Sequence, residues 1–384
     1  AAAEIMEAAR IPVIDLYAFT MDLIQAEGDP FRDHVHFRPD VSEQQGAFVH
    51  KSLLEVFKNH YTEPSPLPDG EPVRGWNILS DSLEDGLRVI ERAPDYGINH
   101  LQLSHEIIHD LRHIDDPARA EVAHALTGAA HLAGIREVVL WDRLFYELDY
   151  YPERFRTGPK GTLNLDDPDF WEWLKADYRR MLDRSPDIQG LIMTFIETRT
   201  RIEHQHSEVM KTDAEKLARA VSAVAEVVIG ERGLNLYART FAYYPGEYDR
   251  IVSAVEQFSH PQIRIMIKET PHDFFLTHPN NPLPGRFERG TLAEFDITGE
   301  FNGQGLIANT WPEYILRRAG DLLQRPHVIG YVARTDRYGR TRLIDQPGEI
   351  NLLALKRFME DPSVTPEAVT EAFIEEHYGE AAVI

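Results

Sequence analysis

Short apolar runs alternate with amphipathic segments along most of the chain after residue 73. The apolar runs are rich in Val, Ile, Leu and aromatic residues and have the length of buried strands, whereas the segments between them repeat apolar residues with a helical period. This pattern predicts eight strands, at residues 75–79, 99–103, 137–140, 190–195, 235–238, 264–267, 292–297 and 327–332. Eight strand–helix repeats over about 300 residues have the length and order of a closed barrel of parallel strands.

Residues that favour helix ends stand at several edges of the amphipathic segments. Ser82, Asp116 and Thr212 each precede a segment that their side chains can cap, and both Asp116 and Asp167 are followed by proline. Gly134 marks the end of the helix that begins after Asp116. A doubly wound open sheet is the competing fold, but no glycine-rich phosphate loop follows the first strand. We therefore predict an α/β protein of the (β/α)8 TIM-barrel class.

A proline-rich stretch divides the chain into two parts. Residues 61–73, YTEPSPLPDGEPV, contain four prolines and one glycine, which interrupt both helices and strands, so a linker is predicted here. Residues 1–60 before it form a small α/β appendage with a strand at Ile11–Ile14 and a helix around Gln44–Lys58. Residues 74–384 after it form the barrel.

The charge balance and the absent cysteines exclude several classes of function. The 384 residues include 40 Lys and Arg against 63 Asp and Glu, a formal net charge of −23, which repels nucleic acid and anionic lipid. No apolar run is long enough to span a membrane, and without cysteine there is no disulfide or thiolate chemistry. Residues 1–10 lack the pattern of a signal peptide, so we expect a cytoplasmic or periplasmic location if the source is bacterial. The oligomeric state stays open, with a dimer as one option.

Three carboxylates follow predicted strands, at the end of a barrel where enzymes carry their catalytic groups. Glu197 follows the fourth strand, Asp273 the sixth and Glu300 the seventh. Cleavage of a glycosidic bond needs one carboxylic acid to protonate the leaving oxygen and a second carboxylate to activate water or attack the sugar. A single acidic residue can equally well cap a helix, but the three together predict a carbohydrate-active hydrolase that needs no cofactor.

Further polar and aromatic residues near the strand ends are predicted to bind an oligosaccharide substrate. They are Glu106, Trp141, Asp142, Arg239, Tyr243 and Lys268, and Trp76 offers another ring face for a sugar. Two pairs of alternate histidines, His34 with His36 and His204 with His206, have the spacing of metal ligands. No third ligand stands at an obvious spacing, so solvated loop histidines and no metal are expected.

Several stretches resemble the family 67 glycoside hydrolases, the α-glucuronidases, over about residues 75–350. They are YGINHLQLSHE, GTLNLDDPDFWEWLKADYRRMLDRSPDIQGLIM, GLNLYARTFAYYPGEYDRIVSAVEQF, IRIMIKETPHDFF and LAEFDITGEFNGQG, in the order of that family. Lys268 and Asp273 match its motif on strand six, and Glu300, Gly303 and Gln304 match its motif on strand seven.

This resemblance implies an inverting α-glucuronidase-like enzyme acting on a uronate-containing plant or algal oligosaccharide, for example from xylan. It implies that Glu197 is the general acid, that Asp273 and Glu300 activate water, and that Arg239 and Lys268 line the pocket and bind a uronate. The chain departs from the family around Glu197, where no basic residue stands beside the acid. It also has no room for the family's N-terminal β-domain and large C-terminal helical domain.

The first sixty residues resemble the C-terminal tail of a GDSL/SGNH esterase. The stretches IPVIDLYAF and DHVHFRPDVSEQQGAFVHKSLLEVF carry this resemblance, and Asp33 with His36 match the family's Asp-x-x-His motif. In that family the histidine activates a serine and the aspartate orients the histidine. The serine block would lie upstream, so we expect no esterase activity from this segment and a parent protein that joins an esterase to a glycosidase.

Two other readings of the strand-end carboxylates remain open. The first is a retaining glycosidase with Glu197 as acid and Glu300 as nucleophile, because retaining and inverting enzymes differ mainly in the separation of the two carboxyl groups. The second is a carbohydrate-binding barrel without catalytic activity. A metal-dependent amidohydrolase is a further alternative, which would require metal in the purified protein.

Overall fold

The computed structural model describes residues 18–22, 38, 40–42, 44–49, 64–242, 244, 246–303, 308–337 and 342–379. The chain divides into two compact units, Ala1–Thr62 and Glu63–Ile384.

Helical turns make up most of what is described of the first unit. The ring of Phe19 stacks on that of Phe48 with centroids 4.1 Å apart, and Gln45 Nε2 donates a hydrogen bond of 2.8 Å to Thr20 Oγ1. The helix predicted from residue 44 is present over the described residues 44–49. The strand predicted at Ile11–Ile14 and the esterase-like pair Asp33 and His36 lie outside the described residues.

Eight parallel strands of the second unit close into a barrel in sequence order, which confirms the predicted (β/α)8 fold. Each predicted strand overlaps an observed one, with ends that differ by at most three residues. The strands are β1 (Val73–Ile78), β2 (His100–Leu103), β3 (Glu137–Arg143), β4 (Gly190–Thr194), β5 (Asn235–Thr240), β6 (Arg264–Lys268), β7 (Thr291–Phe295) and β8 (Val328–Arg334).

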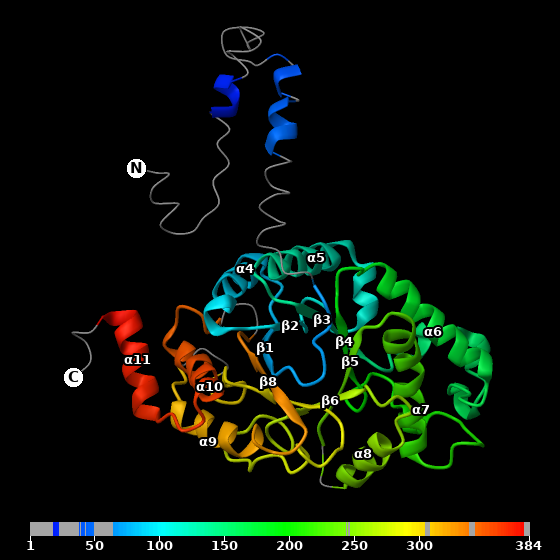
Figure 1. Cartoon of the computed structure of the whole chain (residues 1–384). Helices are drawn as coiled ribbons and strands as arrows, with labels where there is room; N and C mark the ends of the chain where they lie inside the picture. Colours follow the sequence, from blue (N-terminus) through cyan, green and yellow to red (C-terminus); the bar gives the residue numbers. More distant parts are fainter. Residues whose placement is uncertain are drawn as a thin grey trace. The chain divides into compact units, whose positions relative to one another are not determined.

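Helices surround the ring of strands (Figure 1). They are α4 (Leu83–Arg92), α5 (Pro117–Leu132), α6 (Pro168–Asp183), α7 (Asp213–Ala225), α8 (Glu247–Glu256), α9 (Pro312–Leu322), α10 (Ile350–Glu360) and α11 (Pro366–Tyr378). The predicted caps are confirmed, since Ser82, Asp116, Asp167 and Thr212 each accept a hydrogen bond from a backbone N–H in the first turn of their helix.

One of the eight repeats has no helix. The chain between β6 and β7, residues 269–290, is fully described and contains only turns and bends. Pro271, Pro279, Pro282 and Pro284 fall in this segment. Proline lacks the N–H that a helix interior needs and clashes with the preceding turn, so the segment stays irregular. The expected pattern of eight complete repeats is corrected here.

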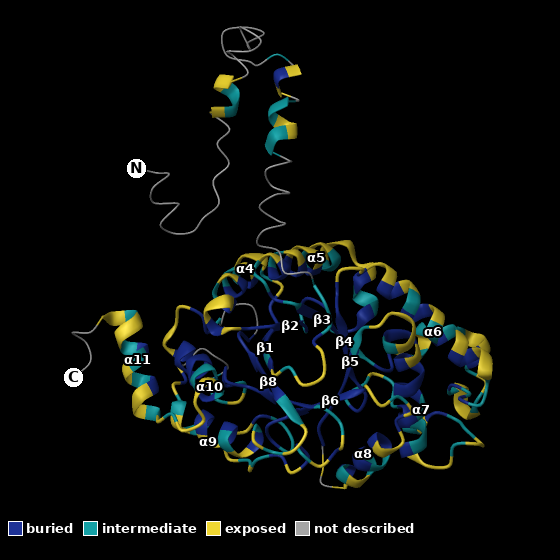
Figure 2. Cartoon of the chain, viewed as in Figure 1, coloured by how far each residue is buried: buried dark blue, intermediate teal, exposed yellow. Residues whose placement is uncertain are grey.

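Two apolar cores lie on the two sides of the barrel wall. The larger fills the space between strands and helices, and the helices are accordingly buried on their inner faces and exposed outside (Figure 2). The smaller fills the interior of the barrel, and its members include Val139, Ile192, Met266, Leu292 and Val332. Successive strand residues face opposite sides of the wall, so every second residue belongs to the interior.

The segment 64–72 closes the barrel at the amino-terminal ends of the strands. Leu67 joins the inner core and is 1% exposed, and its carbonyl oxygen accepts hydrogen bonds from Arg264 and Asn235. Its N–H donates to Glu137 Oε1. This part of the predicted linker therefore packs as part of the barrel unit.

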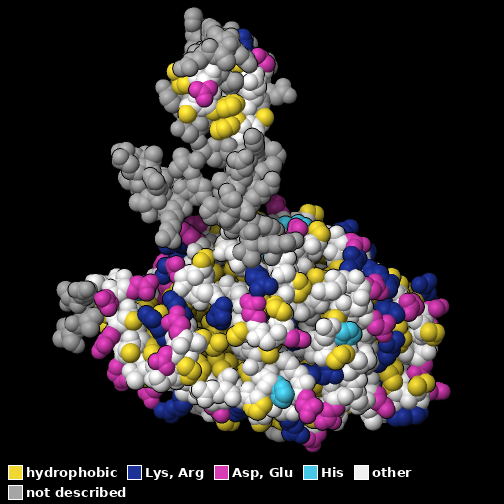
Figure 3. All heavy atoms as spheres, viewed as in Figure 1, with side chains coloured by type: hydrophobic (Ala, Val, Ile, Leu, Met, Phe, Trp, Pro, Cys, Tyr) yellow, Lys and Arg dark blue, Asp and Glu magenta, His cyan; other side chains and the backbone are white. Residues whose placement is uncertain are grey.

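Charged side chains of both signs are interspersed over the face of the barrel unit that Figure 3 presents. Many form exposed ion pairs, such as Arg179 with Glu231 at 2.7 Å, which contribute little stability individually. No helix among the described residues is long and apolar enough to cross a membrane.

Candidate active site

A layer of charged and polar side chains caps the inner core at the carboxyl-terminal ends of the strands. Because every second residue points inward, the residue two positions after an interior apolar residue also faces the barrel axis. Tyr237 is followed in this way by Arg239, and Leu292 by Glu294. We call this end of the barrel the mouth, and its inward strand residues include Asn77, Arg239, Lys268, Glu294 and Arg334.

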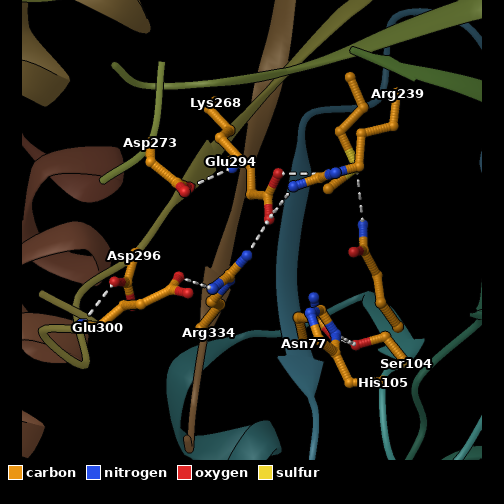
Figure 4. A network of polar contacts seen from close by, with 12 residues as sticks. Asn77, Ser104, His105, Arg239, Lys268, Asp273, Glu294, Asp296, Glu300 and Arg334 are labelled. Atoms are coloured by element: carbon orange, nitrogen blue, oxygen red, sulfur yellow. Dashed lines mark hydrogen bonds and ion pairs between the residues drawn. The ribbon is translucent and has the colours of Figure 1, made fainter. Parts of the chain in front are cut away.

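A chain of ion pairs crosses the mouth, and Figure 4 shows its part from Arg239 through Glu294 to Arg334 and Glu300. Arg239 contacts Glu197 at 3.2 Å and Glu294 at 2.7 Å. Arg334 contacts the same Glu294 at 3.1 Å and continues to Glu300 at 2.7 Å. Glu197 and Glu300, two of the predicted catalytic carboxylates, are thus linked through three buried charges. These are the charges of Arg239, Glu294 and Arg334, which the sequence alone did not indicate to be neighbours.

Glu294 is the centre of this chain and has no exposed surface. Its burial alone would raise its pKa, but the charges of Arg239 and Arg334 outweigh burial and hold the pKa of Glu294 at about 2. Glu294 is therefore ionised at neutral pH and fixes both guanidinium groups. It acts on the predicted catalytic residues by positioning their partners.

The third predicted carboxylate, Asp273, belongs to a second ion pair at the mouth. Its Oδ1 accepts a hydrogen bond of 2.6 Å from Lys268 Nζ, and Figure 4 presents this pair next to Glu294. Burial would raise the pKa of Asp273, but the Lys268 charge outweighs it and lowers the pKa. The Lys268 ammonium also lies 3.6 Å from the centroid of the Phe241 ring.

A tight turn after β7 fixes the position of Glu300. Asp296 accepts hydrogen bonds from the Thr298 hydroxyl at 2.5 Å and from the Glu300 backbone N–H at 2.8 Å. Gly299 between them has φ +79°, and a Cβ at this position would lie 2.1 Å from Asn309 Nδ2. The turn therefore requires glycine, and it directs the Glu300 side chain to Arg334 and Arg337.

Two predicted substrate-binding positions, Trp76 and Asp142, point away from the mouth. Trp76 packs in the outer core with its ring 5.0 Å from that of Tyr96. Asp142 accepts hydrogen bonds from the hydroxyl groups of Tyr146 and Tyr178, and burial raises its pKa to about 6. Both predictions are wrong because the strand alternation places these residues on the outer side of the wall.

Trp141 faces the interior as expected, but its ring is covered. The residue is 1% exposed, and the Arg239 guanidinium lies 4.6 Å from its ring centroid while the His105 ring lies 5.2 Å away. The prediction that it offers a free ring face to a sugar is therefore wrong. Trp141 instead forms the floor beneath Arg239 and His105.

The remaining predicted residues have different outcomes. Glu106 is half-buried just after β2, and burial, with a smaller contribution from the Glu106 charge, raises the pKa of Asp336 beyond β8. Tyr243 lies outside the described residues, as does Gln304 of the strand-seven motif. His204 ends a short 3-10 helix and His206 forms a backbone bridge with Asn164; within the described ranges, no three His, Asp or Glu side chains are grouped to hold a metal ion.

Sequence reasoning missed Glu294, Arg334, Asn77 and His105. The first three had a signal, because each is a polar residue in phase with the apolar inward positions of its strand. His105 had none, since it follows β2 in a loop and its place depends on the left-handed backbone at φ 49°.

Comparison with known proteins yields matches of fold alone. No family model and no curated protein matches the chain. The chain is similar to the solved structure of a Thermobaculum terrenum O-GlcNAc hydrolase, with 11% identity and a TM-score of 0.53, over 84% of this chain and 64% of that one. It is also similar to a GH138 enzyme targeting pectin rhamnogalacturonan II, with 11% identity and a TM-score of 0.53, over 88% of this chain and 45% of that one. The chain thus spans less than two thirds of either structure, and at this identity the similarity establishes a shared barrel fold.

Proposed function

We propose that the protein is a glycoside hydrolase whose active site is the mouth. The observation that carries this proposal is that Glu197, Asp273 and Glu300, from the loops after three different strands, each pair with a separate cation on the inner face of the barrel. Barrel enzymes place their catalytic groups at this end, and paired carboxylates are the groups that glycosidic cleavage requires. The fold shared with two carbohydrate-acting enzymes is in keeping with the proposal.

The substrate we propose is an oligosaccharide that carries a uronate, as the resemblance to α-glucuronidases implies. Arg239, Lys268 and Arg334 are nearly fully buried cations at the mouth, and a sugar carboxylate can make charge-assisted hydrogen bonds with such groups. Phe275 and Phe301 supply an apolar surface, because their rings stack with centroids 4.1 Å apart. Phe275 is 42% exposed and Phe301 is 39% exposed. The apolar face of a sugar ring can pack on such a pair.

The proposed mechanism is inverting. Glu197 gives its proton to the glycosidic oxygen as the bond between that oxygen and the anomeric carbon breaks. A water molecule attacks the anomeric carbon from the opposite side, and Glu300 takes the proton that this water loses. Asp273 accepts the other hydrogen bond of the water and holds it in line, so each proton and each bond is accounted for.

The test is a screen of uronate-bearing and neutral oligosaccharides in which NMR identifies the anomer of the first product. We expect cleavage of a uronate-bearing member and a product of inverted configuration. A product of retained configuration supports the alternative in which Glu300 is the nucleophile. Binding without cleavage across the panel supports a non-catalytic carbohydrate-binding barrel. If no member of the panel is bound or cleaved, the proposal is refuted.

A further inference from the structure

His105 lies at the mouth without a role in the proposed mechanism. It follows β2 with a left-handed backbone, φ 49°, which costs energy in residues other than glycine. Its ring packs between those of Trp141 and His109, with centroid distances of 5.2 and 4.8 Å. In Figure 4 it lies beside Asn77 and Ser104, on the side of the mouth opposite Asp273. The surrounding contacts hold this ring in one place.

The hydrogen bonds of this cluster favour one tautomer of the His105 ring. The Ser104 hydroxyl donates its single proton to Asn77 Oδ1 at 2.7 Å. Ser104 Oγ also lies 2.8 Å from His105 Nδ1, where the donor and acceptor roles depend on the histidine tautomer. With the Ser104 proton on Asn77, Ser104 Oγ accepts a hydrogen bond from Nδ1. In the tautomer that suits these bonds, Nδ1 of His105 is protonated and Nε2 carries a lone pair.

The charges around His105 keep the ring neutral. Burial is the largest influence that lowers the pKa of His105, and the nearby cations Arg334, Arg337 and Arg239 lower it further, to well below its ordinary value. No side chain or backbone group in the described ranges forms a hydrogen bond with Nε2, and the residue remains partly exposed. The mouth thus contains a neutral ring nitrogen beside its cations.

We propose that His105 Nε2 accepts a hydrogen bond from a hydroxyl group of the sugar bound at the mouth. Arg239, Arg334 and Lys268 can only donate hydrogen bonds, and they suit a carboxylate. A fixed neutral acceptor suits a hydroxyl group, which can donate a hydrogen bond. His105 would therefore select sugars that carry a hydroxyl group where the sugar ring faces Nε2. This inference rests on the proposed glycoside hydrolase function and assigns His105 to substrate positioning, without a proton transfer.

The first experiment needs no substrate. Nitrogen-15 NMR of protein labelled in its histidine rings distinguishes protonated from unprotonated ring nitrogens, and the His105→Gln variant identifies the His105 signals. We expect an unprotonated Nε2 in a ring that stays neutral between about pH 5 and 8, where an unperturbed histidine titrates. A protonated Nε2, or a ring that titrates in this interval, overturns the proposal.

The second experiment adds D-glucuronic acid and D-glucose to the same labelled protein. We expect the His105 Nε2 signal to move on sugar binding, while the signal of the exposed His124 on α5 stays in place as the control. Sugar binding that moves the signal of the neighbouring His109 but leaves the His105 signal unchanged overturns the His105 assignment alone. If neither sugar binds and the oligosaccharide screen is also negative, the proposed function itself fails.

Matched variants give the third readout, on the substrate that the screen identifies. His105→Gln places an amide oxygen near the position of Nε2, whereas His105→Phe keeps the ring shape and removes the acceptor. We expect KM to rise about tenfold in His105→Phe, as the loss of one hydrogen bond implies, and to change less than threefold in His105→Gln. Equal KM values in the wild type and in His105→Phe contradict the proposal.

Discussion

Arg239 on β5 reaches past β6 to hold Glu294 on β7 through two hydrogen bonds, from Nε to Oε2 at 2.7 Å and from Nη2 to Oε1 at 3.3 Å. This fork of two bonds fixes the plane of the guanidinium and leaves its Nη1 for Glu197 at 3.2 Å. The position of the proposed general acid therefore depends on a carboxylate that itself takes no part in the reaction.

Glu294→Gln is expected to destabilise the fold. The variant leaves the buried charges of Arg239 and Arg334 without their shared counter-ion, and breaking a buried pair in this way costs about 3–5 kcal/mol. Urea unfolding measures the change. Glu300→Gln is the matched control, because the Glu300 side chain is 14% exposed and is replaced by the same amide. Equal stability of the two variants would show that Glu294 is not the central charge.

Glu300→Gln is expected to lower kcat on the true substrate by about a hundredfold or more, since the amide cannot accept the proton of the attacking water. The backbone bond from Glu300 to Asp296 is retained, so the turn after β7 should persist. Steady-state kinetics measures the effect. The effect on KM should be small, and a kcat within a few-fold of the wild-type value contradicts the proton-acceptor role.

The contribution of Glu269 to the stability of the protein is expected to be lost as the pH rises from about 4.5 to 8. Burial raises the pKa of Glu269 to about 8, although Arg318 acts in the opposite direction. In this interval the folded state keeps the proton that the unfolded state releases, so unfolding becomes easier at higher pH, by an amount on the order of a few kcal/mol.

Chemical unfolding of the wild type and of Glu269→Gln at several pH values measures this effect. The stability of the variant relative to the wild type should increase with pH, because glutamine does not titrate. Asp142 and Asp336, whose pKa values are also raised to about 6, occur in both proteins and cancel in the difference. A difference that is constant with pH would mean that Glu269 is ionised in the folded protein.

Phe275 and Phe301 are expected to contribute to substrate affinity through their stacked, exposed rings. Replacing both by alanine should raise KM about tenfold, which corresponds to about 1.4 kcal/mol, with a smaller change in kcat. Tyr378→Ala on α11 is the control, because this aromatic residue is 64% exposed and stands on a helix after the last strand. An unchanged KM in the double variant would exclude the pair as a sugar surface.

The period of the apolar residues was sufficient to predict the strands and the closed barrel. The helix caps at Ser82 and Thr212 could be predicted too, because a cap depends only on residues that are neighbours in the sequence. The predictions at Trp76 and Asp142 were wrong because they considered only that each residue lies near a strand end. They did not consider that successive side chains of a strand face opposite sides of the barrel wall. Trp76 is adjacent to the inward Asn77, and Asp142 to the inward Trp141, so their own side chains face outward.

The pairing across the mouth could not be obtained from the sequence. Arg239 and Glu294 are 55 residues apart, and nothing in either segment indicates that β5 and β7 bring them together until the ring of strands is closed. The conformation of His105 is a second case, because a left-handed histidine is determined by its contacts with Trp141, His109 and Ser104. Such features follow from tertiary packing and not from local preference.

The apolar interior of the barrel determines where a ligand can enter and leave the mouth. Ile192, Met266 and Val332 pack together inside the strands, and Leu67 plugs the opposite end. A molecule that binds at the mouth beside Arg334 cannot pass through the packed interior of the barrel, so it has to leave from the mouth as well. If the protein cleaves sugars as proposed, a cleaved fragment that dissociates slowly from this end would act as an inhibitor.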